Sequence, residues 1–504
     1  MPRKVSDHIV ERLQEWGVER IFGYSGDGIN GIIGALDRAG NTPRFIQSAH
    51  EELAALMACA HAKFTGQVGV CLATQGPGAI HLLNGLYDAR SDHQPVVAVV
   101  GQQSTTAMGG EYQQEIDLLS LFKDVAGAYV QMVTSPAQVR HVIDRAFRIA
   151  LAERTVTCII VPHDIQDEEA IEQPPHEHGA MHSGVGWSAP RVLPTDADLA
   201  RAAEVLNAGR RPAILIGAGA LAATDEVIAV AEKLGAGVAK ALLGKAALPD
   251  DLPFVTGSVG WLGTRASNEM LAECDTLLMV GTSFPYIEYY PKPGQAKCVQ
   301  IELDPKRIGL RHPVDAALVG DSARVLRLLL PRLDHQQDRA FLGTAQKGMA
   351  EWRELMQERG TRTDTPMKPQ VVAHELNKLL SDDAILATDS GTITTWIARH
   401  VDMRGNMMFS CSGNLATMAC ALPYANAAAI AYPGRQVICF IGDGGFSMLM
   451  CELATAVKYG LDVKIVVISN DTLGQIKWEQ MVFLGNPEYG CDCLLYTSPS
   501  PRDS

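Results

Sequence analysis

Short apolar runs alternate with segments of helical periodicity along most of this 504-residue chain. The runs at residues 69–74, 95–101 and 436–441 are apolar almost throughout. A strand that is buried on both faces gives such a run, because helices cover both faces of a parallel sheet. The alternation therefore predicts an α/β protein with three doubly wound parallel-sheet domains in series.

Breaks in the alternation predict the domain boundaries. The expected order is an N-terminal domain at 1–166, a linker at 167–193, a central domain at 194–335, a connector at 336–365 and a C-terminal domain at 366–492. The linker is rich in proline, histidine and glycine, and the connector is charged and helical. Residues 493–504 have neither helical nor strand periodicity and look like adapter or vector sequence. We therefore expect a non-native tail and an incomplete, C-terminally truncated third domain; the alternative is a disordered polar terminus.

Composition narrows the classes of partner and compartment. The net charge is −14 without a long basic block, so we expect no nucleic-acid partner. The eleven cysteines are scattered, without paired CxxC units, which is typical of a reducing compartment. The charged N-terminal helix has no signal-peptide core, and no uncharged span reaches membrane-crossing length. The prediction is a cytoplasmic protein; membrane contact through sequence beyond Asp492 stays open.

The stretch after the apolar run at 436–441 predicts a metal site. It reads Gly442-Asp443-Gly444-Gly445, a helix follows, and a second strand ends at Asn470. Two parallel strands joined by a crossover helix bring Asp443 and Asn470 to the same edge of the sheet, where ligands bind. A carboxylate, an amide oxygen and a backbone carbonyl suit Mg²⁺, and glycines let the backbone approach phosphates. An isolated Asp-Gly pair more often marks a turn, but Asn470 favours the metal site.

This motif resembles the thiamine diphosphate motif of the pyruvate oxidase and acetolactate synthase superfamily. The resemblance covers nearly the whole chain up to Asp492. It implies the thiamine diphosphate-binding fold, with a pyrimidine-binding first domain, a Rossmann-like, FAD-binding-like central domain and a diphosphate-binding third domain. The implied Mg²⁺ ligands are Asp443, Asn470 and Thr472. Asp471 replaces the usual second asparagine, and we expect metal binding to remain because Asn470 is the ligand.

Further motifs carry the same resemblance. "SAHEELAA" places the cofactor-activating glutamate at Glu51, "EYQQE" places the active-site glutamine at Gln114, and "LGQIKWEQ" puts Glu479 toward the substrate. The resemblance also implies cofactor contacts at Gly26, Thr74, Gly76, Pro77, Gly78, Asn84, Ser390, Gly391, Thr392, Met418, Gly442, Gly444 and Gly445, with Met418 keeping the cofactor bent. A carboxylate at Glu51 can hold the aminopyrimidine ring in the tautomer that removes the thiazolium proton. Glu52, which faces another direction on the helix, is the natural control.

The central domain determines the expected redox chemistry. Its "ILIGAGALA" stretch superficially resembles a dinucleotide fold, but lysines stand where an NAD site needs an acidic residue. Its loops resemble the flavin segments of pyruvate oxidases and quinone-dependent pyruvate dehydrogenases. This implies FAD contacts at Gly263, Thr264, Arg265, Ser283, Phe284, Pro285, Glu302 and Asp321. The alternative is an FAD-free relative that keeps these loops as structure.

The resemblance implies an oxidoreductase that uses thiamine diphosphate, Mg²⁺ and FAD. It would decarboxylate pyruvate or a related 2-oxo acid and pass electrons to oxygen or a quinone. The alternative within the family is a transferase, acetolactate synthase, that joins two 2-oxo acids. The alternative of another class is a non-catalytic flavin- or nucleotide-binding scaffold. The resemblance also implies a homodimer or homotetramer.

Overall fold

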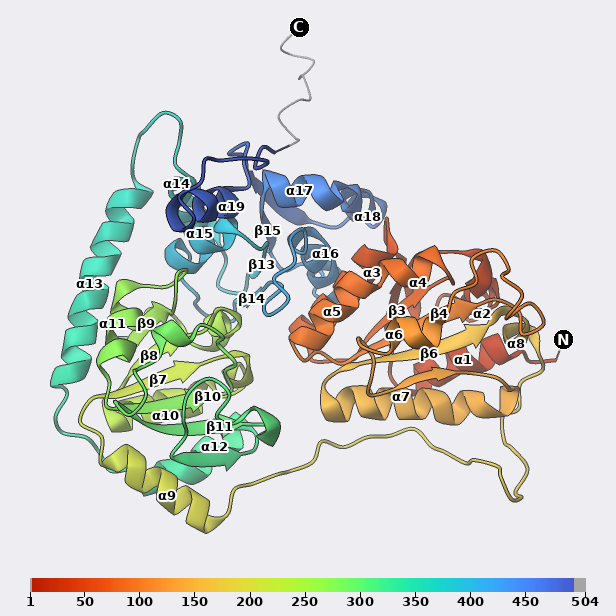
Figure 1. Ribbon diagram of the computed structural model, residues 1–504, viewed down its shortest axis with the longest axis horizontal. Coiled ribbons are helices and arrows are strands. Elements are labelled where there is room, and N and C mark those ends of the chain that lie inside the picture. The colour runs from red at the N-terminus through yellow and green to blue at the C-terminus, as the bar shows by residue number, and fades with distance from the viewer. Residues whose placement is uncertain (1, 494–504) are drawn as a thin grey trace, which may run out of the picture. The chain divides into compact units, whose positions relative to one another are not determined.

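The computed structural model describes residues 2–493, so all but the first residue of the expected tail lie outside the described part. Figure 1 shows parallel sheets with helices on their faces, which confirms the predicted α/β class. The chain divides into two compact units. Among the described residues, one unit holds 2–189, 386–390 and 410–493, and the other holds 190–385 and 391–409. The domain boundaries predicted from the sequence stay predictions.

The first sheet has the strand order β2-β1-β3-β4-β6-β5. Its strands are β1 (Arg20–Gly23), β2 (Arg44–Gln47), β3 (Gly69–Ala73), β4 (Val96–Gln102), β5 (Val130–Met132) and β6 (Val156–Pro162). The helices of this part are α1 (Val5–Glu15), α2 (Asn30–Arg38), α3 (Glu51–Thr65), α4 (Pro77–His81), α5 (Leu83–Ser91), α6 (Leu118–Phe122), α7 (Val139–Glu153) and α8 (His163–Asp167). Every residue of β3, β4 and β6 is buried, as the continuous apolar runs predict.

Helices cover both faces of this sheet. Apolar side chains of α1, α2 and α7 form one core with the strands, while α3 and α5 lie on the opposite face (Figure 1). Helix α3 is buried on nearly all sides because it packs against β3, α5 and α16 (Ala421–Ala431). An all-round apolar helix is typical of such a central position.

The second sheet has the order β12-β11-β10-β7-β8-β9. Its strands are β7 (Pro212–Ile216), β8 (Gly237–Lys240), β9 (Val255–Ser258), β10 (Thr276–Val280), β11 (Lys297–Glu302) and β12 (Ala316–Val319). Its helices are α9 (Asp196–Asn207), α10 (Thr224–Leu234), α11 (Arg265–Glu273), α12 (Ser322–Leu329) and α13 (Ala340–Gly360). Helices α9, α10 and α12 share one apolar core with the strands, and α11 and α13 share another. Two cores on opposite faces make this sheet doubly wound.

The third sheet has the order β14-β13-β15-β16. Its strands are β13 (Ile385–Thr388), β14 (Met408–Ser410), β15 (Val437–Gly442) and β16 (Val463–Ile468). The helices of this region, besides α16, are α14 (Pro369–Leu379), α15 (Thr392–His400), α17 (Asp443–Leu449), α18 (Leu453–Lys458) and α19 (Gly474–Trp478). The single helix that periodicity predicts between β15 and β16 is interrupted by a 3₁₀ turn (Met450–Glu452). There Glu452 is buried and accepts a hydrogen bond from the Ala49 N–H group.

Candidate active site

Chain topology explains where the predicted residues gather. In the first sheet β1 and β3 are neighbours, while the chain continues from β1 to β2 on one side and from β3 to β4 on the other. In the third sheet β13 and β15 stand in the same relation. The carboxyl ends of such strand pairs are topological switch points, where open α/β sheets bind ligands. Gly26 and Thr74 follow β1 and β3, and Asp389 and Asp443 follow β13 and β15.

Asp443 and Asn470 lie at adjacent strand ends. β15 and β16 pair in parallel, with Gly442 opposite Ile468. Asp443 is 2 % exposed, and its Oδ2 accepts hydrogen bonds from the backbone N–H groups of Asn470 (3.2 Å) and Asp471 (2.8 Å). The structure thus brings together the two residues that the sequence places at one edge.

The Asn470 amide completes a cluster of oxygen atoms. One terminal atom of this amide lies 3.2 Å from Asp443 Oδ1 and 2.9 Å from the Thr472 carbonyl oxygen. With nitrogen in that place the amide donates to both oxygens; with oxygen there, three oxygens converge. A carboxylate, an amide oxygen and a backbone carbonyl are hard ligands that fit Mg²⁺. Asp443, Asn470 and Thr472 therefore fit the predicted metal, with Thr472 offering its carbonyl.

A Cβ at either of two glycines after Asp443 would meet a neighbouring side chain. A Cβ added at Gly445 would lie 1.8 Å from Asp389 Oδ2, and one at Gly444 would lie 2.7 Å from Leu473 Cδ2 and 3.6 Å from Met418 Cε. Burial raises the pKa of Asp389 to about 6. Gly442, in contrast, has open space where a Cβ would stand. Gly442 therefore leaves space for a ligand beside Asp443. Met418 lies next to Gly444.

The remaining residues predicted in this part of the chain follow β13. Ser390 is half-buried directly after Asp389. Gly391 has φ +103 with open space around its Cβ position, and Thr392 begins α15. An L-residue rarely adopts such a φ, so the chain needs glycine at 391.

Glu51 lies at the start of α3, after β2. It is 8 % exposed, and its Oε2 lies 3.0 Å from His81 Nδ1. The His50 side chain caps this helix by accepting a hydrogen bond from the Glu52 N–H group at 3.2 Å. Glu52 Oε1 instead accepts a hydrogen bond from Asn84 at 2.6 Å. The two neighbouring glutamates thus have different partners, as expected for adjacent helix positions.

The turn after β3 packs against Glu51 and Gln114. A Cβ at Gly78 would lie 2.8 Å from Thr74 Cγ2 and 3.1 Å from Glu51 Oε1. Gly76 has φ +57, and a Cβ there would lie 2.9 Å from Gln114 Cβ. The structure therefore brings Thr74, Gly76, Gly78, Gln114 and Glu51 into one cluster.

Two other residues predicted for this first cluster border it. Pro77 opens α4, where its fixed φ suits the first helical position. A Cβ at Gly26 would lie 2.5 Å from Thr74 Cβ. Gly26 therefore lies against the Thr74 side chain.

Several polar residues of this cluster were not found from the sequence. Gln75 donates hydrogen bonds to Gln114 (3.1 Å) and Asp27 (3.3 Å). One nitrogen of each of the His50 and His81 rings and one Glu51 oxygen all lie within 4.8 Å of one another, so these three side chains could also hold a metal ion. In the sequence, His81 could have been found from its position at the end of the short helix that begins at Pro77.

Glu479 contacts a residue of its own segment of the chain. It directly follows α19, and its Oε1 accepts a hydrogen bond from Gln475 at 3.1 Å. Glu479 is half-buried. Its role toward a substrate stays a prediction.

Residues predicted to contact FAD lie in the second compact unit, and several have structural partners there. Thr264 caps α11 and Asp321 caps α12 by accepting backbone hydrogen bonds. Glu302 ends β11 and accepts hydrogen bonds from Leu303 and Asp304, while burial raises its pKa. Arg265 pairs with Glu351 at 2.6 Å.

The flavin-like loop after β10 is partly open. Phe284 is buried beside Tyr290, Ser283 is half-buried and Pro285 is exposed. A Cβ at Gly263 would lie 2.2 Å from the Ser258 carbonyl oxygen, so this glycine is required by packing. Tyr286 stacks on Trp261 with ring centroids 6.4 Å apart, and both are partly exposed. The sequence motifs did not predict this stacked aromatic pair. Contact with FAD stays a prediction.

Comparison with known proteins identifies the family. Three family models match: the N-terminal TPP binding domain of thiamine pyrophosphate enzymes at residues 3–121, the central domain at 199–329 and the C-terminal TPP binding domain at 389–501. The chain is 41 % identical to the Bacillus subtilis (strain 168) protein YdaP, whose name gives thiamine pyrophosphate and no reaction, over 95 % of this chain and 82 % of that protein.

Two other relatives are named for different reactions. The chain is 34 % identical to a pyruvate oxidase of Lactiplantibacillus plantarum, over 94 % of this chain and 78 % of the relative. It is 31 % identical to an acetolactate synthase large subunit of Parasynechococcus marenigrum, also over 94 % and 78 %. Because these relatives match nearly the whole chain and the three family models follow in order, the chain belongs to the thiamine pyrophosphate enzyme family.

Proposed function

We propose that this protein is a thiamine diphosphate- and Mg²⁺-dependent enzyme that oxidatively decarboxylates pyruvate or a related 2-oxo acid, with FAD as the electron acceptor. The single observation that carries the proposal is that the Asp443 carboxylate, the Asn470 side-chain amide and the Thr472 carbonyl meet beyond the ends of adjacent parallel strands. The 34 % identity to a pyruvate oxidase supports the choice of reaction.

The residues of the third domain would hold the cofactor. The carboxylate of Asp443 and the oxygens of Asn470 and Thr472 would ligate Mg²⁺, which would supply positive charge for the diphosphate. Open space at Gly442 leaves room for that group. When bound, thiamine diphosphate would supply a carbon nucleophile for the substrate carbonyl and an acceptor for the electron pair left by decarboxylation.

The residues of the first domain would control a proton. Glu51 would hold a proton at a ring nitrogen of the aminopyrimidine, and its partial burial strengthens that hydrogen bond. His81 orients the Glu51 carboxylate through the 3.0 Å contact. Gln114, beside the Gly76 turn, would bond to the substrate. Glu479 would face the substrate from the third domain.

The overall reaction balances with water. Pyruvate and one water molecule give acetate, CO₂, two protons and two electrons. FAD would be the acceptor for these two electrons, with oxygen or a quinone as the final acceptor.

The proposal also covers the assembly and the compartment. In the family, residues of two subunits complete one site, so the proposal includes a homodimer or homotetramer. It also includes a reducing, cytoplasmic compartment, which the eleven unbridged cysteines support. Within residues 2–493, no helix is both long and apolar enough to span a bilayer.

A second candidate function is acetolactate synthesis. Several relatives carry that name, at 30–31 % identity. There the two-carbon fragment joins a second 2-oxo acid and no electrons leave. The presence of Glu51, Asp443 and Asn470 together disfavours a non-catalytic scaffold, because such a scaffold has no chemical need for all three.

One experiment separates these functions. The purified protein is mixed with pyruvate, thiamine diphosphate, Mg²⁺ and FAD, and CO₂, acetolactate and reduced quinone or consumed oxygen are measured. We expect one equivalent of oxygen or quinone reduced for each CO₂ released. CO₂ release accompanied by acetolactate, without electron transfer, would assign the synthase function instead. Absence of all three products would support the scaffold.

A further inference from the structure

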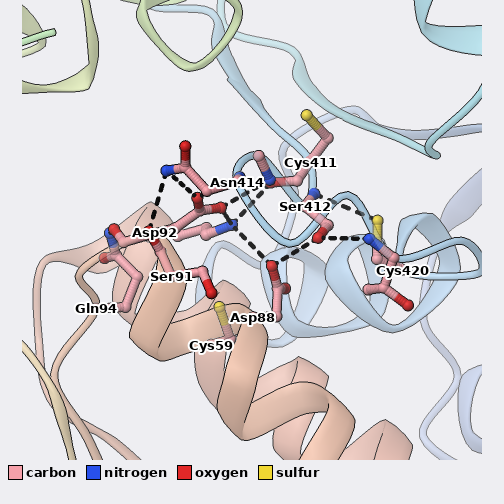
Figure 2. A network of polar contacts seen from close by, with 12 residues as sticks. Cys59, Asp88, Ser91, Asp92, Gln94, Cys411, Ser412, Asn414 and Cys420 are labelled. Carbon is pink, nitrogen blue, oxygen red and sulfur yellow. Dashed lines mark hydrogen bonds and ion pairs between the residues drawn. The ribbon is translucent and has the colours of Figure 1, made fainter. Parts of the chain in front are cut away.

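A buried charge cluster lies outside the residues given a role above. Lys63 on α3 and Asp88 and Asp92 at the end of α5 have side chains that are 5 %, 0 % and 0 % exposed. Figure 2 shows Asp88 and Asp92 projecting from one helix toward the segment that contains Ser412 and Asn414. The cluster thus joins the first domain to the third within one compact unit.

The cluster is electrostatically costly unless all its partners are present. Asp88 and Asp92 stand four residues apart on one helix face, at the negative end of the helix dipole. Lys63 Nζ compensates by donating hydrogen bonds to Asp92 Oδ2 and Tyr424 Oη, each at 2.7 Å. Burial opposes ionisation of Lys63, but the two carboxylates raise its pKa well above the usual value.

The pKa values of the two carboxyl groups shift in opposite directions. Burial also acts against the Asp92 charge, yet Lys63 and two backbone N–H groups keep the Asp92 pKa below its usual value. Burial raises the pKa of Asp88, to which the Tyr424 hydroxyl donates a hydrogen bond. Lys63 Nζ lies 2.7 Å from Asp92 Oδ2 and 3.9 Å from Asp88 Oδ1, so Asp92 is its closer partner.

These carboxylates hold residues 412–418, which we call the 412–418 loop. Asp92 accepts hydrogen bonds from the backbone N–H groups of Gly413 and Asn414, both at 2.7 Å. Asp88 Oδ1 accepts one from Ser412 Oγ at 2.7 Å, and Ser412 Oγ in turn accepts one from the Thr417 N–H group at 3.0 Å. Four contacts from two carboxylates and one hydroxyl thus define the path of the loop.

The loop needs this support because its backbone is strained. Ala416 and Ala419 have φ values of +55 and +69, which residues with a Cβ rarely adopt. Such conformations persist when surrounding contacts determine them. Met418 lies between these two alanines, and its Cε lies 3.6 Å from the place of a Cβ on Gly444, next to Asp443. The strained loop thus presents Met418 at the edge that carries Asp443.

We propose that Lys63, Asp88 and Asp92 are positioning residues that clamp the 412–418 loop and thereby hold Met418 against the cofactor site. The inference rests on the proposed function, because it assumes that thiamine diphosphate binds beside Asp443. The three clamp residues would act on that site without touching the reacting atoms. It predicts that a change at the clamp alters cofactor affinity through the loop, beyond any loss of overall stability.

Asp92→Asn is the main test. It removes the Lys63 ion pair and weakens the hydrogen bonds to Gly413 and Asn414. Two readouts are measured: hydrogen–deuterium exchange of peptides covering 412–418 without cofactor, and the Kd of thiamine diphosphate at saturating Mg²⁺ by calorimetry. We expect exchange in that segment to be faster, and Kd to rise, by about tenfold or more, because a charged buried acceptor is lost. Activity at saturating cofactor should largely return.

Asp144→Asn is the matched control. Asp144 is also 0 % exposed, and it pairs with Arg12 at 2.6 Å in the same compact unit. Its replacement should lower the unfolding temperature without changing either readout. If Asp144→Asn raises the Kd as much as Asp92→Asn does, the effect is general destabilisation and the clamp proposal is wrong.

Ser412→Ala guards against an Asp92 variant that does not fold. It removes one hydroxyl that joins Asp88 to Thr417 and leaves the buried charges in place. We expect faster exchange in the loop and a higher Kd, in the same direction as for Asp92→Asn. Unchanged exchange and Kd in this folded variant would overturn the clamp. A wild-type protein that binds no thiamine diphosphate would instead overturn the proposed function, and the exchange readout would still test the loop contacts.

Discussion

His81 Nδ1 lies 3.0 Å from Glu51 Oε2, so the buried carboxylate at the start of α3 has an imidazole as its direct partner. His81 is the last residue of α4, and the segment between β3 and His81 also holds Thr74, Gly76 and Gly78. Because one polar contact joins two segments of the first domain, the direction of the Glu51 carboxylate depends on both.

Glu51→Gln should slow proton exchange at the thiazolium carbon of bound cofactor by orders of magnitude. The amide fills the same space but cannot stabilise the protonated ring nitrogen, so cofactor affinity should change little. Hydrogen–deuterium exchange at that carbon, followed by NMR with saturating cofactor, measures the effect. Glu52→Gln is the control, because Glu52 bonds to Asn84 instead. If proton exchange is slow in Glu52→Gln and remains fast in Glu51→Gln, then Glu52 and not Glu51 is the activating glutamate.

His81→Ala should slow the same exchange by a smaller factor, about tenfold. Glu51 keeps its charge but loses the hydrogen bond that orients it, and a charge-assisted hydrogen bond typically accounts for a factor of that size. The same NMR measurement on this variant gives the result. Exchange at the wild-type rate would show that His81 does not orient Glu51.

Asp443→Asn should weaken binding of Mg²⁺ and thiamine diphosphate, because a neutral amide replaces the carboxylate, the one charged group among the three predicted metal ligands. Activity should partly return at high Mg²⁺ and cofactor concentrations, by mass action. Titration of activity against both ligands tests this. An activity loss that no concentration relieves would place Asp443 in the chemistry rather than in binding.

The purified protein should be yellow and release a flavin on denaturation. If FAD binds beside the loop after β10, the Trp261–Tyr286 pair, stacked 6.4 Å apart, lies close enough to report it. Adding FAD to flavin-stripped protein should therefore quench tryptophan fluorescence, and Trp261→Phe should remove most of the change. If the active protein is colourless and needs no FAD, the reaction is a non-oxidative decarboxylation or a carboligation instead.

Glu452→Gln should change the pH dependence of stability. Burial raises the Glu452 pKa from 4.5 to about 7, so the native state keeps this proton where the unfolded chain has released it. The stabilising contribution is complete below about pH 4.5 and is lost as the pH rises to about 7, a difference of about 3 kcal/mol. Urea unfolding at pH 5 and pH 8 should show the variant gaining stability relative to wild type as the pH rises. An equal difference at both pH values would contradict the buried-carboxyl assignment.

The sequence by itself determined the α/β class, the parallel direction of the strands and the meeting of Asp443 with Asn470. These follow from local rules, because apolar periodicity defines each element and a crossover connection places successive parallel strand ends at one edge. The thiamine diphosphate motif could be recognised for the same reason, since its residues are fixed to those strand ends.

Tertiary structure alone decided which side chains meet across the fold. Asp92 and Asn414 are 322 positions apart, Glu452 and Ala49 are 403 apart, and no local pattern relates either pair. The interruption of the helix after Asp443 was also invisible to periodicity, because it accompanies the inward turn of Glu452 toward another domain. Such contacts arise when packed surfaces bury polar groups that must then find partners, and only the assembled fold supplies those partners.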